Sequence, residues 1–117
     1  MIRDDWELVP GDLMLAQLGP IRGSEQDGLR PVLVVSAAGM HHLSRRAMIC
    51  PITRNTRPWP TKVFLPEGSA AEGAILCDQL RAIDRRARIL RRLGAASPET
   101  LLAVRSKIAA LLGIDVA

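Results

Sequence analysis

The segment 19–36 constrains the fold of this chain more than any other stretch. Its first half is polar and contains three glycines, which permit positive φ angles or close backbone approach. Its second half contains the β-branched, apolar run 32–35, which predicts a buried strand. We therefore expect a polar loop attached to a core strand, with Arg30 at the junction and Pro31 favouring extended backbone there. An ordinary surface loop with a solvated arginine has the same pattern.

Length and composition limit the kinds of protein that this chain can be. With 117 residues, 48% of them apolar, the chain suits one globular domain spanning 1–117. No stretch approaches the roughly 18 to 20 continuous apolar residues of a membrane-spanning helix. The charged start of the sequence lacks the apolar core of a signal peptide. We therefore expect a cytoplasmic protein that does not associate with a membrane.

The formal net charge of +4 bears on the kind of partner. Lys62 and Lys107 are the lysines, and every other basic residue is an arginine, whose planar guanidinium suits phosphates. This charge permits nucleic-acid binding, but it suits an acidic protein partner equally well.

The cysteines and histidines do not form a recognisable metal site. Cys50 and Cys77 each lie in an apolar, strand-like run and lack the close spacing of zinc ligands, so we expect buried free thiols. His41 and His42 are adjacent and would face opposite sides of a strand, so we interpret them as part of a polar turn over 38–45. We expect no metal and no cofactor.

The order of apolar runs predicts several short strands followed by one helix. Pro51 lacks an amide donor and should lie at a sheet edge or bulge. Ser97 is a good N-cap for the helix, which should end near Gly113. We predict a mostly β (α+β) fold, a small antiparallel barrel with a C-terminal helix. The strands are expected over 11–18, 30–37, 46–53, 61–65 and from 74 onward, and the apolar stripe of the helix comprises Leu101, Val104, Ile108 and Leu111.

A longer motif over 23–36 resembles a known family. The order Gly-Ser-Glu-Gln-x-Gly-x-Arg-Pro-Val-x-Val-x-Ser, preceded by Pro-Gly-Asp-Leu at 10–13, is similar to the MazF/PemK family of toxin endoribonucleases from type II toxin–antitoxin systems. The resemblance extends over roughly 9–113. It implies an SH3-like barrel that forms a homodimer, with single-stranded RNA as substrate and a cognate acidic antitoxin as partner.

Residues 78–93 admit two interpretations. Apolar residues recur at helical spacing from Leu80 to Leu90, which predicts an amphipathic helix. The resemblance implies instead a strand over 78–84, a helical turn over 84–86 and a final strand near 89–93. We favour the second interpretation.

The resemblance maps catalytic positions onto Arg30 and Thr53. It implies attack by the 2′-hydroxyl of RNA on the phosphate, which yields a 2′,3′-cyclic phosphate and a 5′-hydroxyl. A guanidinium can grip two phosphate oxygens and stays protonated, so it suits stabilisation of charge better than proton abstraction. Thr53 can donate to a nonbridging oxygen, although such a residue is also ordinary in a strand. Glu25, the carboxylate of the Gly-Ser-Glu-Gln segment, is the candidate proton acceptor; a solvated loop charge is an equal alternative.

Six further residues are candidate RNA contacts. The arginines and the tryptophan of loop 54–60 could hold a single strand by phosphate pairing and stacking, or the tryptophan could anchor a protein partner. The polar residues of the first loop could bind bases or phosphate, or satisfy loop amides. One glutamine matches a family position near the site. These residues are Ser24, Gln26, Arg54, Arg57, Trp59 and Gln79.

Two other functions remain open at this point. A poison on the same barrel could bind a protein, as the related CcdB-type inhibitors of DNA gyrase do, and it would not need Arg30 and Thr53 together. A noncatalytic SH3-like module would bind RNA or protein without cleaving it. The joint presence of both motifs favours the endoribonuclease, and a gel assay with RNA separates it from the noncatalytic module.

Overall fold

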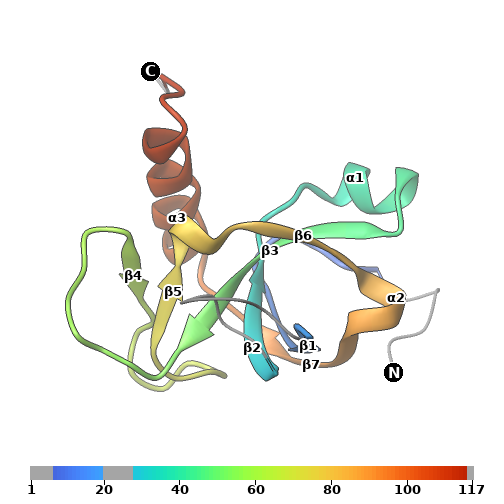
Figure 1. Cartoon of the computed structure of the whole chain (residues 1–117), viewed down its shortest axis with the longest axis horizontal. Helices are drawn as coiled ribbons and strands as arrows, with labels where there is room; N and C mark the ends of the chain where they lie inside the picture. Colours follow the sequence, from blue (N-terminus) through green and yellow to red (C-terminus); the bar gives the residue numbers. More distant parts are fainter. Residues whose placement is uncertain (1–6, 20–27, 116–117) are drawn as a thin grey trace.

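The computed structural model describes residues 7–19 and 28–115. Figure 1 shows a strongly curved sheet with the long helix α3 on one side and the short helices α1 and α2 on the other. In chain order the elements are β1 (Asp12–Gln17), β2 (Leu29–Val34), α1 (Ala38–Leu43), β3 (Arg46–Thr53), β4 (Lys62–Phe64), β5 (Ala74–Leu76), the 3₁₀ turn η1 (Cys77–Gln79), β6 (Arg81–Asp84), α2 (Arg85–Arg88), β7 (Ile89–Ala95) and α3 (Pro98–Leu111).

The strands form one antiparallel sheet. Their order is β4-β5-β3-β2-β1-β7, and β6 lies beside β3 off this path. Each pairing between the described strands is antiparallel. The predicted mostly β antiparallel fold with a C-terminal helix is therefore confirmed. Among the described residues the strand order does not close into a ring, so the word barrel describes the curvature of the sheet only.

Strand β3 is the centre of the sheet. One side of it pairs with β2. The other side pairs with β6 up to Ile49 and with β5 from Ile52 onward. Pro51 lies between these two partners and opposite Val32, in the central strand and not at the sheet edge or bulge that we expected. A residue without an amide donor is tolerated there because the hydrogen-bond ladder on that side is already interrupted.

Alternation of side chains along the strands produces two cores, one on each face of the sheet. Leu13 lies opposite Leu33, and Met14 lies opposite Val32. The first pair belongs to one buried cluster and the second pair to the other. The cluster of Leu13 also contains Val104 of α3, which is fully buried, so the helix covers this face of the sheet.

Helix α3 begins and ends as predicted. The hydroxyl of Ser97 accepts a hydrogen bond from the amide of Thr100 at 3.1 Å, and Gly113 follows the helix with φ of 73°. The predicted apolar stripe packs only in part, since Leu111 is 47% exposed. In the part of the chain described, none of the helices has the length and apolar content needed to cross a membrane.

Both cysteines are buried free thiols, as predicted. Burial raises the pKa of the Cys50 thiol far above its ordinary value. Burial also raises the pKa of Cys77, to about 11, although nearby Lys107 acts in the opposite direction. Both side chains therefore behave as small apolar groups of the core.

The polar turn expected over 38–45 is wrong, because the segment contains helix α1. Its His41 is buried. The hydroxyl of Ser36 accepts from the amide of Met48 at 3.0 Å and donates to Nε2 of His41 at 2.6 Å, while Nδ1 of His41 donates to the carbonyl of Leu8 at 2.5 Å. Leu8 is 33 residues from His41 in the sequence, and Ser36 lies outside the segment 38–45, so the pattern within that segment did not reveal the role of His41.

The single amphipathic helix considered for 78–93 is also wrong. The favoured interpretation is confirmed in outline, with a strand, a helical turn and a final strand in that order. It differs at its start, because Cys77–Gln79 forms a 3₁₀ turn and the strand β6 begins only at Arg81.

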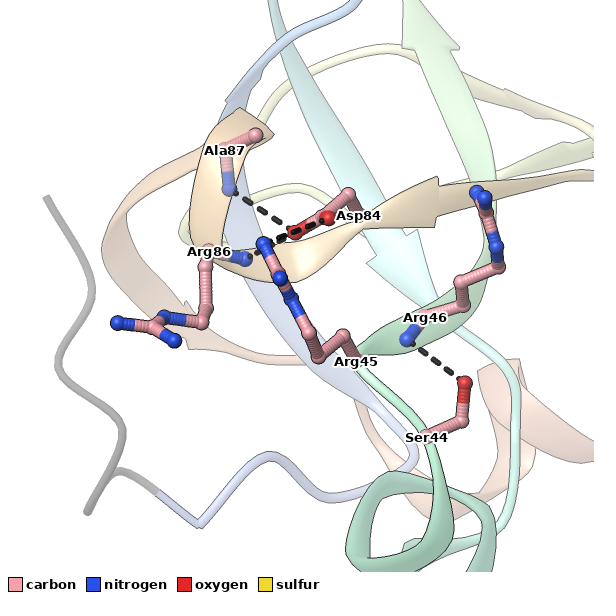
Figure 2. A network of polar contacts seen from close by, with 6 residues as sticks. All are labelled: Ser44, Arg45, Arg46, Asp84, Arg86 and Ala87. Atoms are coloured by element: carbon pink, nitrogen blue, oxygen red, sulfur yellow. Dashed lines mark hydrogen bonds and ion pairs between the residues drawn. The ribbon is translucent and has the colours of Figure 1, made fainter.

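Asp84 begins the helical turn α2 (Figure 2). Its carboxylate accepts hydrogen bonds from the amides of Arg86 and Ala87 at 3.0 and 3.1 Å, and it pairs with Arg45 at 3.0 Å. The hydrogen bond from Ala87 and the charge of Arg45 hold the pKa of Asp84 below its ordinary value. A local cap therefore interrupts what would otherwise continue as one strand.

The buried network of His41 generates a stability prediction. His41→Ala should lower the free energy of unfolding by about 1 to 3 kcal/mol, because it removes the hydrogen-bond donor to the Leu8 carbonyl and the acceptor for the Ser36 hydroxyl proton. Urea denaturation measures the change. His42→Ala is the matched control, since the side chain of His42 is 68% exposed, and it should leave stability nearly unchanged. Equal effects of the two substitutions would contradict a structural role for the network.

Candidate active site

The two predicted catalytic positions lie on adjoining strands. The register of β2 and β3 pairs Val32 with Pro51. This is the last pair at that end of the two strands, so Arg30 and Thr53 both lie two residues beyond it, at the same edge of the sheet. Arg30 is held there by its pairing with Ala16 of β1, and Thr53 by its pairing with Ala74 of β5.

Hydrogen bonding orients the hydroxyl of Thr53. The residue is buried, and its Oγ1 accepts from the amide of Asn55 at 3.1 Å. That bond uses the oxygen as an acceptor and leaves the hydroxyl proton for another partner. A nonbridging phosphate oxygen is a suitable acceptor for this proton. The geometry is therefore compatible with a donor role for Thr53.

The loop that follows β3 is held by its own polar groups. Oδ1 of Asn55 accepts from the amide of Arg57 at 3.0 Å. The ammonium group of Lys62 donates to the carbonyls of Asn55 and Arg57, each at 2.8 Å. From this braced backbone the loop exposes Arg54, Arg57 and Trp59, and the tryptophan is 64% exposed. Two cations and an aromatic surface thus lie beside the end of β3, as single-strand binding requires.

The first loop is closed at its base. The amide of Leu18 donates to the carbonyl of Gly28 at 2.9 Å. Gly19 and Gly28 have φ of 75° and 72°, angles that other residues adopt rarely. The three predicted site residues of this loop lie outside the described residues, so their roles stay predictions: Ser24, Glu25 and Gln26.

Arginines from β6 and α2 reach the same loop base. Arg81 donates to the carbonyl of Leu18 and Arg88 to the carbonyl of Gln17, each at 3.4 Å. The end of β1 therefore lies beside positive charge contributed by a distant part of the sequence.

Gln79 lies in η1, which joins β5 to β6. Both of those strands pair with β3, so η1 spans the gap where β3 changes partner. The half-buried Gln79 is therefore placed beside the strand that carries Thr53. Its predicted position near the site agrees with this arrangement.

A cavity of about 660 Å³ opens beside these residues. It brings Arg30 and Arg54 together with the loop 66–73, which joins β4 to β5. The sequence analysis did not identify Ser69 and Glu72 of that loop as site residues. The available signal was Glu72, an acidic residue in a turn that leads directly into a strand. The lining residues are Leu15, Leu29, Arg30, Pro31, Ile52, Arg54, Ser69, Ala70, Ala71, Glu72 and Leu93.

Gly73 allows this loop to approach the end of β3. Its φ is 120°, and a Cβ atom at this position would overlap the carbonyl oxygen of Thr53. Its own carbonyl accepts from the amide of Leu65 at 2.9 Å, and the next residue, Ala74, pairs with Thr53. The position of Thr53 therefore depends on the absence of a side chain at Gly73.

The arrangement suits binding of a phosphodiester. A guanidinium and a hydroxyl donor face the same region, and both are good partners for phosphate oxygens. Among residues 7–19 and 28–115, no group of three histidine, cysteine, aspartate or glutamate side chains could hold a metal ion.

Fold and site together define a class: small, curved antiparallel sheets that present arginine and hydroxyl groups for phosphate binding where two strands end. Within that class the chain belongs to the PemK-like, MazF-like toxins of type II toxin–antitoxin systems, whose family model matches residues 9–112. The predicted family is therefore confirmed.

Individual relatives agree with this assignment. The chain is 34% identical over 103 residues to the endoribonuclease toxin MazF of Escherichia coli K12, covering 88% of this chain and 92% of that protein. Its structure is similar to MazF from Deinococcus radiodurans, with a TM-score of 0.87 and 34% identity over 94% of this chain and all of that one. A MazE–MazF structure from the same organism matches with a TM-score of 0.83 and 33% identity over 95% of this chain and all of that chain.

The close approach at Gly73 generates a second prediction. Gly73→Ala should destabilise the protein by several times the cost of Gly68→Ala, because both glycines have positive φ but only Gly73 lies against backbone. The conformational cost alone, as in Gly68→Ala, is about 1 to 2 kcal/mol.

Urea denaturation measures both changes, and the amide chemical shifts of Thr53 and Asn55 report displacement at the site. If the two alanine variants had the same stability and the same spectra, the loop contact would not position Thr53.

Proposed function

We propose that this protein is a toxin that cleaves single-stranded messenger RNA at specific sequences, without a metal ion, by attack of the 2′-hydroxyl. The observation that supports this proposal most is that Arg30 of β2 and Thr53 of β3 lie at the same end of two paired strands, just beyond the pair of Val32 with Pro51. The Escherichia coli relative carries the name endoribonuclease toxin, which agrees with this chemistry.

The reaction needs stabilisation of the charge on the phosphate, a proton acceptor for the 2′-hydroxyl and a proton donor for the leaving oxygen. Arg30 stabilises the charge that develops on the nonbridging phosphate oxygens. Thr53 donates its hydroxyl proton as a hydrogen bond to one of them. Glu25 accepts the proton of the 2′-hydroxyl, whose oxygen then bonds to phosphorus while the bond to the 5′-oxygen breaks. The leaving 5′-oxygen takes up a proton from water, Glu25 returns its proton to the solvent, and the products are a 2′,3′-cyclic phosphate and a 5′-hydroxyl.

The RNA strand extends from this centre over two loops. Arg54 and Arg57 pair with phosphates and Trp59 stacks on a base, since all three are exposed beside the end of β3. The polar side chains that complete the binding surface are Ser24, Gln26 and Gln79.

The protein acts as a cytoplasmic homodimer in this proposal. The resemblance implies the dimer, and apolar side chains left exposed on α3 and just after it offer contact area for a second copy. Leu102, Leu112 and Ile114 are 66%, 64% and 55% exposed.

A cognate acidic antitoxin inhibits the protein by covering the RNA surface. The family is defined by toxin–antitoxin systems, and a similar structure from Deinococcus radiodurans contains MazE with MazF. A surface that attracts phosphates also attracts carboxylates, and Trp59 provides an apolar anchor between arginines.

Cleavage of a long RNA in EDTA tests the proposed reaction. The unmodified protein should cut at a recurring sequence and leave cyclic phosphate and 5′-hydroxyl ends. Arg30→Ala and Thr53→Val should each lower the cleavage rate about 10²- to 10³-fold, the usual loss for one preorganised donor to a developing oxyanion.

Thr53→Ser is the matched control because it keeps the hydroxyl, and it should retain most activity. Circular dichroism checks that each variant is folded. Activity that disappears in EDTA and returns with magnesium would refute the metal-free reaction. Near-normal turnover by folded Arg30→Ala would place the catalytic centre elsewhere.

Competition tests the proposed inhibition. A noncleavable RNA oligonucleotide should displace the antitoxin from Arg30→Ala protein, and Trp59→Ala should weaken antitoxin binding. Phe64→Ala serves as the control, since Phe64 is another exposed aromatic residue, 45% exposed and on β4. Simultaneous, independent binding of RNA and antitoxin would show that they use separate surfaces.

A further inference from the structure

We infer that the cavity beside Arg30 is a base pocket in which Glu72 selects a nucleobase bearing an exocyclic amino group. The inference rests on the proposed cleavage of RNA, and it adds a specificity-determining residue that belongs to neither of the two predicted loops.

The position of the cavity relative to Thr53 is the first argument. Ile52 precedes Thr53 in β3 and Arg54 follows it, and both of them line the cavity together with Arg30. The cavity is therefore adjacent along the chain to the proposed catalytic hydroxyl. A nucleotide whose phosphate lies at Arg30 can place its base there.

The lining of the cavity contains both apolar and polar groups. Leu15 and Pro31 lie opposite each other on β1 and β2, and Leu93 of β7 is a third partly exposed apolar residue of the lining. The volume of about 660 Å³ is in the usual range of roughly 300 to 1,000 Å³ for small-ligand pockets. A nucleobase can pack its flat face against the apolar groups while the polar groups form hydrogen bonds with its edge.

The polar groups at the cavity determine which base fits. The carboxylate of Glu72 only accepts hydrogen bonds, so it recognises an amino group and disfavours the carbonyl edge of uracil. The hydroxyl of Ser69 already donates to the carbonyl of Pro66 at 2.6 Å, which leaves its oxygen as a second acceptor. Within the described residues, Glu72 and Arg54 make no hydrogen bond or ion pair with one another or with other groups.

The backbone holds Glu72 in a defined place. The adjacent Gly73 lies against the carbonyl of Thr53, and Ala74 pairs with Thr53 in the sheet. The carboxylate is thus attached to the same point of β3 as the catalytic hydroxyl. Recognition of a base and alignment of the scissile phosphate are consequently linked through one short segment of rigid backbone.

Selection from a randomised hexamer pool tests the pocket directly. The hexamers carry 2′-fluorine in place of the 2′-hydroxyl, so they lack the nucleophile and cannot be cleaved by the proposed reaction. Bound hexamers are recovered from the unmodified protein, Glu72→Gln and Glu67→Gln, and are sequenced. Glu67 is the matched control because it is an exposed glutamate of the same loop that does not line the cavity.

At one position the unmodified protein should select adenine, cytosine or guanine over uracil on the order of tenfold or more. Glu72→Gln should reduce this preference to near zero, because an amide presents a donor as well as an acceptor, and Glu67→Gln should retain it. An unchanged preference in Glu72→Gln, or the absence of any base preference in the unmodified protein, would overturn the inference.

The same proteins are then incubated with ordinary RNA. Cleavage by all three proteins with identical cut sites would refute the pocket while leaving the proposed function intact. A Glu72-dependent preference in the selection without cleavage of RNA would refute the proposed function while leaving the pocket intact.

Discussion

The change of partner along β3 is the constraint on which the rest of this structure depends. One strand is bound by β2 along one side, and by β6 and then β5 along the other. The two cores lie on the two faces of this sheet, because successive side chains of its strands point to opposite faces. Pro51 lies in β3 where the partner changes, and Gly73 lies against the backbone of Thr53 just beyond it.

Sequence patterns predicted an element correctly where residues close together in the sequence determine it. The span of β3 was predicted residue for residue, because its apolar run is bounded by polar loops. The start of α3 followed from Ser97, which forms its cap with a residue of the same turn. Helix α1 was missed because His41 obtains its hydrogen bonds from Leu8 and Ser36, and no pattern within 38–45 encodes those partners.

The candidate site shows the same division. Arg30, Thr53 and Gln79 were predicted from a resemblance of motifs, and the sheet brings the segments that carry them to neighbouring places, since β2, β5 and β6 all pair with β3. Spacing alone could not have paired them, since the register depends on the whole sheet. The cavity was missed because Glu72 enters it from a turn with no distinctive motif, and only the close approach at Gly73 brings that turn to β3.

The closed base of the first loop makes the pairing of the sheet independent of the length of the loop. Because the chain enters and leaves at one hydrogen-bonded point, between Leu18 and Gly28, the pairing of β1 with β2 does not depend on how many residues lie between them. Doubling the length of such a loop costs only about 0.6 kcal/mol in closure entropy. Evolution can therefore lengthen, shorten or exchange the tip while the sheet beneath it stays the same. A single scaffold can in this way diversify its ligands at almost no expense in stability.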